Sequence, residues 1–189
     1  MQKKLLSIML SVVFLAMGTL VCQAQENKDP AALAKESAAK AQATADKQLT
    51  PTMIKQKVRT ASQLLEEKGE AAFPEFQGKD SKFIFAGTYI WIHDMEGVMR
   101  MHPIKYKLNG NNVLKLKDPN GKMLFAEMNS VCEEQGSGWV YYHWPKPGES
   151  EASPKISFVK LAEHGNNRFV VGCGTYDSEV IKQVRAKEQ

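Results

Sequence analysis

The segment that most constrains the fold is KFIFAGTYIWIH, at residues 82–93. Both of its alternating sides are apolar, and it is rich in the aromatic and β-branched residues that strands favour. A strand that is apolar on both sides lies in the interior of a sheet. We therefore predict one continuous central strand over residues 82–93.

A helix is predicted ahead of this strand. Thr50 can cap a helix that begins at Pro51. Apolar residues then recur at steps of three, four and seven, as in a helix with one buried side: Ile54, Val58, Ala61, Leu65 and Ala72. Residues 25–49, by contrast, are rich in Ala, Lys and Gln and contain only Leu33 as a large aliphatic residue. We expect a solvated tether or a frayed helix there.

The remaining segments predict one more helix and four more strands. The turn residues DMEG at 94–97 separate the central strand from VMRMHP, which indicates a hairpin. After the turn DPNG at 118–121, a helix is predicted with one packed side, ended by two glycines: Leu124, Met128, Val131 and Gln135, then Gly136 and Gly138. Three strands follow, GWVYYHWP, KISFVKLA and NRFVVGCGTY, and then a short polar helix or a frayed end from Asp177. This order predicts an α+β domain on one five-stranded antiparallel sheet.

The N-terminus has the parts of a secretory signal. Lys3 and Lys4 precede an uncharged apolar run over residues 5–21, and the small residue Ala24 stands at the expected cleavage position. An uncleaved membrane anchor is the alternative, because the run lies at the lower limit of what spans a bilayer. We predict a signal peptide over residues 1–24, a tether over 25–49 and a single domain over 50–189, in a periplasmic or secreted protein.

Charge and cysteine content exclude several classes of function. The formal net charge is +4, and the chain has no long basic run interleaved with stacking aromatics, so nucleic acid is not an expected partner. After export, two cysteines remain, Cys132 and Cys173, and neither belongs to a CxxC motif. An oxidising compartment permits a disulfide between them, and two buried free thiols are the alternative.

One predicted strand, in GWVYYHWPKPG at residues 138–148, is aromatic on both sides. Alternation places Val140, Tyr142 and Trp144 on one side and the other aromatic residues on the opposite side. Burial explains the apolar area of these rings, but it does not explain their polar tips. Prolines at 145 and 147 then end the ladder, and the chain returns toward Lys155.

The succession of motifs resembles the single Cache domains, which are extracytoplasmic sensor modules of bacterial chemoreceptors and kinases. It consists of FIFAGTYIWIHDMEGVMRMHP, LNGNNVLKLKDPNGK, GSGWVYYHWPKPG, PKISFV and VVGCGTY, and covers residues 51–176. The resemblance implies a long N-terminal helix, a PAS-like antiparallel sheet and a cavity for a small molecule, often a short organic acid. Phe158 stands where many relatives carry Tyr, which removes one hydroxyl. No kinase or methyl-accepting segment follows Tyr176, so we expect signalling through a separate partner, such as a membrane receptor or kinase.

A ligand cavity of this kind needs apolar walls and a few orienting polar groups. The expected apolar walls are Tyr89, Trp91, Tyr142 and Trp144. The expected polar groups are Arg100, His102 and Lys155. Lysine and arginine form charge-assisted hydrogen bonds, so this set suits a carboxylate. Each residue has an alternative role: Tyr89 and Trp91 as core, Arg100 as a solvated strand residue, and Lys155, by composition alone, as an exposed charge.

Catalytic and metal functions have little support in the sequence. Cys132 or Cys173 could pair with a histidine, but no local signature of a nucleophile is present. His93, Asp94 and His102 could ligate a metal across the predicted hairpin. The turn explains Asp94 equally well, and the end of the strand before Pro103 explains His102. No phosphate loop or dinucleotide motif is present, so no cofactor is expected. We predict a non-enzymatic sensor of a small organic acid, with a ligand-free structural module of the same fold as the alternative.

Overall fold

The computed structural model describes residues 28–188, so the predicted signal at 1–24 lies outside the described residues. Four α-helices and two short 3-10 helices accompany the sheet: α1 Pro30–Ala43, α2 Pro51–Lys68, η1 Gly69–Phe76, η2 Tyr106–Leu108, α3 Leu124–Gln135 and α4 Ser178–Glu188. The strands are β1 Ile84–Phe85, β2 Thr88–Asp94, β3 Met99–Met101, β4 Ser137–Pro145, β5 Ala152–His164 and β6 Asn167–Thr175. The pairing is antiparallel throughout, in the order β1-β2-β6-β5-β4, with β3 beside β2.

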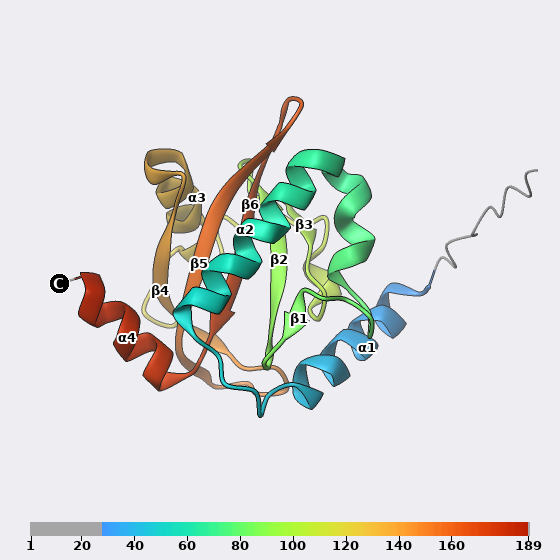
Figure 1. Cartoon of the computed structure of the whole chain (residues 1–189). Coiled ribbons are helices and arrows are strands. Elements are labelled where there is room, and N and C mark those ends of the chain that lie inside the picture. Colours follow the sequence, from blue (N-terminus) through green and yellow to red (C-terminus); the bar gives the residue numbers. More distant parts are fainter. Residues whose placement is uncertain (1–27, 189) are drawn as a thin grey trace, which may run out of the picture.

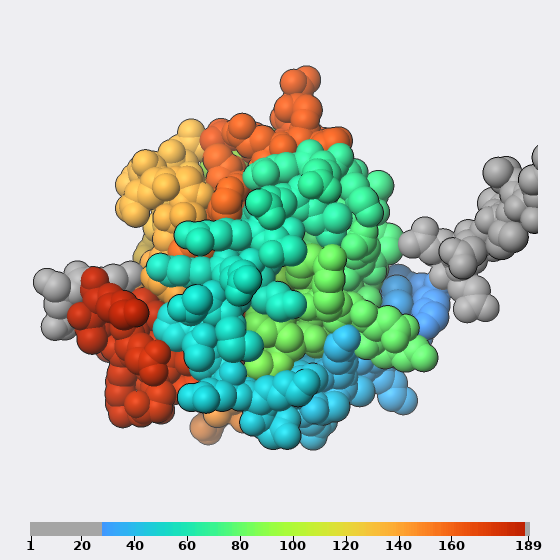
Figure 2. Space-filling view, in the orientation of Figure 1, coloured from blue at the N-terminus to red at the C-terminus, as the bar shows by residue number. Residues whose placement is uncertain are grey.

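Helices cover both faces of the sheet, which gives the domain two apolar cores. Helix α2 crosses one face, here called the α2 face, and α3 lies on the opposite face, here called the α3 face (Figure 1). The space-filling view shows α2 running over the middle of its face, with the β5–β6 hairpin projecting beyond it (Figure 2). Thr50 caps α2 through its hydroxyl, which accepts a hydrogen bond from Met53 N at 3.2 Å. The predicted α+β architecture is confirmed.

Helix α1 replaces the expected tether. Asp29 caps it and Pro30 is its first residue. Its buried residues are small, Ala34, Ser37 and Ala41, and the Ser37 hydroxyl accepts a hydrogen bond from Gly78 N at 2.8 Å. Of the two expected alternatives, a solvated tether or a frayed helix, the structure has a helix at residues 30–43, and it packs against the domain because small side chains allow a close approach without large aliphatic residues.

The predicted central strand is divided into two strands. Phe85 pairs with Thr88, so Ala86 and Gly87 form a two-residue turn between β1 and β2. Both turn residues have positive φ angles, +44° and +73°. Such turns require left-handed backbone at both central positions, which is common for glycine and rare for alanine. The sheet therefore has six strands instead of the five expected.

We predict that Ala86→Gly stabilises the protein. Ala86 occupies the left-handed region at a cost of about 1–2 kcal/mol, which glycine avoids. The greater freedom of glycine in the unfolded chain offsets roughly half of this gain, leaving about 0.5–1 kcal/mol. Urea unfolding measures the change, with the buried Ala72→Gly as a control that should destabilise. A midpoint at or below that of the parent would contradict the prediction.

The two cysteines lie on opposite faces of the sheet and are free. Cys132 belongs to the core of the α3 face, and Cys173 belongs to the core of the α2 face. The disulfide considered from the sequence is therefore wrong for this structure, because the sheet separates the two side chains. Each thiol is a small buried apolar group, and burial raises its pKa to about 12.

Candidate functional site

A small cavity lies on the α3 face, between the sheet and the segments that cover it. Its lining residues come from β2, β4, β5, α3 and the chain after β3: Trp91, His102, Leu108, Leu124, Phe125, Tyr142, Trp144 and Lys155. Five of the seven residues predicted for the site are among them. The volume is about 20 Å³, roughly enough for one water molecule.

Strand alternation and two glycines bring these side chains together. Tyr142 and Lys155 are direct partners across β4 and β5, and both point to the α3 face. On the strand beside them, Gly172 pairs with Trp91. A Cβ atom at Gly172 would lie 2.4 Å from Trp91 Cζ2, and one at Gly174 would lie 2.7 Å from Lys155 Cε. Gly172 and Gly174 therefore present only backbone on the α3 face of β6, and the Trp91 indole and the Lys155 stem pack directly against that backbone.

Lys155 is the central polar group of the site. It is only 5% exposed, and its Nζ lies over four aromatic rings, 4.7 Å from the ring centroid of Tyr176 and 5.5 Å from that of Trp91. Tyr89 and Tyr142 supply the other two rings, at 5.8 and 5.9 Å. Across the part of the chain that the structure describes, no hydrogen bond or ion pair reaches this Nζ. Burial lowers the pKa of Lys155 to about 7.

The other polar groups of the cavity are mainly donors. Trp91 Nε1 is buried without a hydrogen-bond partner. His102 Nδ1 accepts hydrogen bonds from the backbone N–H groups of Ile104 and Lys105, at 3.3 and 3.0 Å, which leaves the ring proton on Nε2. Burial and the neighbouring lysines lower the pKa of His102 to about 3, so its ring is neutral. The cavity thus combines an ammonium group and N–H donors without a facing carboxylate.

Arg100 is not brought to the cavity. Its guanidinium pairs with Asp94, at 3.3 Å, and with Glu70, which follows α2. His93 bonds to Asn129 of α3 through Nε2, at 2.8 Å, whereas Asp94 faces the guanidinium. Within residues 28–188, no group of three or more His, Cys, Asp or Glu side chains could hold a metal ion. The set considered from the sequence, His93, Asp94 and His102, is therefore not brought together.

Tyr89 lies beside the cavity, in a larger neighbouring hollow of about 250 Å³. Lys155 lines this hollow as well, together with Gly174 and Tyr176. The Tyr176 hydroxyl donates to the Pro145 carbonyl at 2.8 Å, which holds its ring over the lysine. The small cavity and the larger hollow therefore meet at one ammonium group.

Sequence reasoning missed the covering residues and Tyr176. Leu108, Leu124 and Phe125 come from segments whose apolar pattern indicated burial but not which cavity they would cover. Tyr176 lies two residues after Gly174, directly beyond the end of β6, and this nearness to the glycine run was the available signal. Phe158, in turn, packs on the α2 face against Trp139, so the hydroxyl that it lacks would not reach the cavity.

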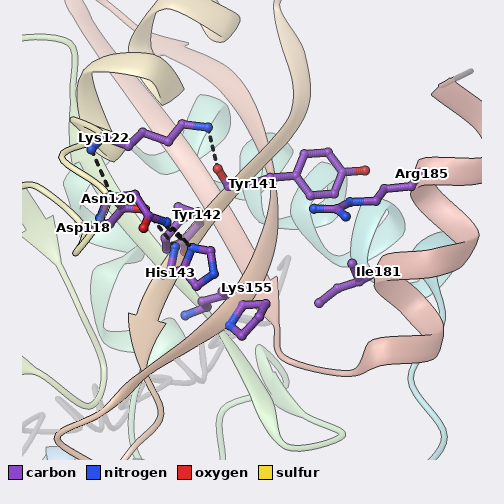
Figure 3. Close-up of a pocket in the computed structure, with 10 residues that line it drawn as sticks. Asp118, Asn120, Lys122, Tyr141, Tyr142, His143, Lys155, Ile181 and Arg185 are labelled. Carbon is purple, nitrogen blue, oxygen red and sulfur yellow. Dashed lines mark hydrogen bonds and ion pairs between the residues drawn. The ribbon is translucent and has the colours of Figure 1, made fainter.

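A third hollow, of about 170 Å³, lies at the outer edge of β4 and also borders Lys155 (Figure 3). On one side of the strand, the buried Asp118 carboxylate accepts backbone hydrogen bonds from Asn120, Lys122 and His143, at 2.9–3.0 Å. Across the strand, Arg185 lies over the ring of Tyr141 at 4.9 Å (Figure 3). These contacts cover the middle of an edge strand and fix its position beside β5.

An antiparallel sheet flanked by helices, with a small cavity around a buried cation on one face, defines a ligand-sensing domain of the PAS-like kind. The chain belongs to the single Cache domain family: the model of Single Cache domain 2 matches residues 23–189. Domains of this family are extracytoplasmic sensors. Within residues 28–188, no helix is both long and apolar enough to cross a membrane.

Two curated relatives are signalling proteins. The chain is 37% identical over 92 residues to the methyl-accepting chemotaxis protein McpP of Pseudomonas putida, covering 49% of this chain and 16% of McpP. It is 33% identical over 98 residues to the sensor histidine kinase MctS of Rhizobium johnstonii, covering 52% of this chain and 21% of MctS. The chain thus matches about a fifth or less of the length of these relatives.

A solved structure supports the same family. It is described as the structural basis for carboxylic acid recognition by a Cache chemosensory domain, and the chain is 32% identical to it. The match covers 73% of this chain and 93% of that chain, with a TM-score of 0.55. The predicted family is confirmed, and the chain is a Cache sensor domain related to chemotaxis receptors and histidine kinases.

Proposed function

We propose that the domain binds a small organic acid, whose carboxylate pairs with Lys155 in the cavity of the α3 face. The carrying observation is the ammonium of Lys155, which pairs with no carboxylate in the described part of the chain; Glu149 lines the neighbouring hollow but pairs with Lys146. Burying a charge is costly unless it is paired, so a site with an unpaired cation favours an anionic ligand. The Nε2 proton of His102 supplies a further donor at the cavity, and Trp91, which lines it, has a buried Nε1 with no hydrogen-bond partner.

The relatives support this choice of ligand class. The structural neighbour described above is a Cache domain that recognises a carboxylic acid, and its likeness to this chain is that of the domain as a whole. The cavity chemistry is therefore the stronger argument, because it rests on this chain's own residues. We propose a non-enzymatic role, in keeping with the sensory relatives; Cys173, on the opposite face of the sheet, is not an activated thiol, because burial raises its pKa to about 12.

Ligand binding requires the covering segments to move. A cavity of about 20 Å³ is smaller than even a two-carbon acid, so a ligand has to displace Leu108, Leu124 or Phe125. Leu124 and Phe125 begin α3, and a bound acid would thus shift the start of that helix. We propose that a separate membrane receptor or kinase detects this change, in the periplasm or outside the cell, and that residues 1–24 direct export. The mass of the exported protein tests the cleavage.

A thermal-shift screen tests the ligand class. Short carboxylic acids at pH 6.5, and at a hundred times their dissociation constant, are expected to stabilise the full exported chain by about 2.7 kcal/mol, or roughly 5–10 °C. The corresponding primary amides match the acids in size but lack the charge, and they should leave the transition within about 1 °C. A flat response to acids, amines and amino acids alike would favour the alternative, a structural or partner-binding envelope module without a ligand.

A further inference from the structure

We propose that the connection between β3 and α3, residues 102–123, steers anions to the cavity and so selects carboxylic acids by their rate of association. The proposal rests on the proposed function and deepens it, because it names the route by which an acid reaches Lys155 and the residues that favour an anion along that route. Residues 102–123 are called the basic connection below.

The basic connection concentrates positive charge. It carries one acidic residue, Asp118, against five lysines: Lys105, Lys107, Lys115, Lys117 and Lys122. The Asp118 side chain is 1% exposed and accepts backbone hydrogen bonds, so it is turned away from solvent. Lys122 pairs with Glu127 at 2.9 Å, and within residues 28–188 none of the other four lysines pairs with a carboxylate. Four lysines without a carboxylate partner therefore lie in one segment.

The basic connection also covers the cavity on the side that a ligand has to open. Lys107 directly precedes Leu108, a lining residue of the cavity. Lys117 is held beside the start of α3 by a β-bridge with Met123, which directly precedes the lining residue Leu124. A ligand that displaces Leu108 or Leu124 therefore moves past segments that carry lysines.

The positive charge of the connection reaches the cavity itself. Lys105 Nζ lies 4.9 Å from the ring centroid of Trp144, which lines the cavity. Burial and, to a smaller extent, the charge of Lys105 lower the pKa of Lys155 to about 7. An anion that approaches over the basic connection thus meets positive charge from the surface to the ammonium group at the centre of the site.

The neighbouring hollow also borders Lys155, but its rim has a different balance of charge. The loop after β4, residues 146–151, carries Lys146 against Glu149 and Glu151. Lys146 and Glu149 both line the hollow and pair with each other at 3.9 Å. A carboxylate that approaches this rim meets no excess of positive charge, so the field favours the basic connection as the route of an anion.

Steering of this kind acts on the rate of encounter. Charges that line an approach raise the association rate of an oppositely charged molecule by about tenfold or more. The screening length is about 30 Å at 10 mM salt and about 8 Å at 150 mM, so the lysines act together mainly at low ionic strength. Dissociation depends on the contacts inside the cavity, and lysines outside it should leave the dissociation rate unchanged.

Paramagnetic NMR of the full exported chain maps where anions gather. The probes are the anionic nitroxide 3-carboxy-PROXYL and its neutral carboxamide, which have nearly the same size. At about 10 mM ionic strength, the amide protons of residues 104–125 should relax about three times or more faster with the anion than with the carboxamide. Those of residues 146–151 should relax at similar rates with both probes. Equal ratios over the two segments would overturn the proposal.

The association rate of acetate, obtained from NMR line shapes, tests whether this route is used. Lys107→Glu combined with Lys117→Glu should lower it by about three- to tenfold at 10 mM ionic strength and by less than about twofold at 500 mM. The matched control, Lys57→Glu combined with Arg59→Glu, makes the same change of charge on α2, on the opposite face of the sheet, and should change the rate by less than about twofold. If Lys146→Glu lowered the rate as much as the first pair does, acids would enter through the hollow, and the proposal would be wrong.

The two readouts separate this proposal from the proposed function. The nitroxide map needs no bound acid, so enrichment of the anion over the basic connection, together with no binding of any acid, would refute acid sensing. Acid binding at a rate that does not respond to the reversal of Lys107 and Lys117 would instead refute steering and leave acid sensing in place.

Discussion

Replacing Lys155 with methionine is expected to weaken the binding of a short carboxylic acid by roughly ten- to a hundredfold. A hydrogen bond to a charged group contributes about 1.5–3 kcal/mol, and each 1.4 kcal/mol changes the dissociation constant tenfold. Methionine keeps most of the apolar stem that lies on Gly174 and among the four aromatic rings. The change therefore removes the charge and little of the packing. Isothermal titration at pH 6.5 measures the loss.

The same substitution should make the unliganded protein more stable. The parent buries an ammonium that no described group pairs with, and its replacement by an apolar side chain removes that desolvation cost. Urea unfolding should show a higher midpoint for Lys155→Met. Lys105→Met is the matched control, because it deletes a half-buried lysine that lies 4.9 Å from the ring of Trp144. It should change the affinity by about threefold or less. If the two substitutions weakened acid binding equally, Lys155 would not be the residue that pairs with the carboxylate.

The side chains that alternation alone can place were predicted from the sequence. Tyr142, Trp144 and Lys155 lie on regular parts of β4 and β5, where each residue step reverses the face. Their grouping on the α3 face follows from that rule. The closeness of Nζ to the rings does not, since it depends on the missing side chains at Gly172 and Gly174.

Arg100 was misplaced because alternation fails in the β2–β3 hairpin. The register shifts between Ile92 and His93, so β3 contains a bulge. As a result Met99 packs in the core of the α3 face and Met101 in that of the α2 face, although the two residues are two positions apart. The bulge turns Arg100 toward Asp94, while His102, which alternation would place beside it, lines the cavity. One irregular pairing thus decides which of two predicted polar residues lines the cavity, and no residue pattern marks it.

The affinity for carboxylic acids is expected to be highest near pH 6–7 and to fall by about tenfold per pH unit above pH 7. Burial lowers the pKa of Lys155 to about 7, so the free protein loses the ammonium above that pH and has to take up a proton to bind an anion. The fall continues until the pH reaches the pKa of Lys155 in the complex, which the bound carboxylate raises. Titration calorimetry at pH 6, 7, 8 and 9, in buffers of different ionisation enthalpy, measures both the affinity and the proton uptake.

The stability of the unliganded protein should change in the opposite sense over the same range. Between pH 7 and the lysine's unfolded pKa the unfolded chain binds more protons than the folded one, so the folded state gains stability as pH rises. On the acid side, burial lowers the pKa of His93 to about 4 and that of His102 to about 3. Their unfolded forms bind protons first as pH falls below about 6.5, so stability is lost there. Lys155→Met should bind its residual ligand equally from pH 6 to 9, and an equally flat profile in the parent would show that this lysine is not the group that meets the acid.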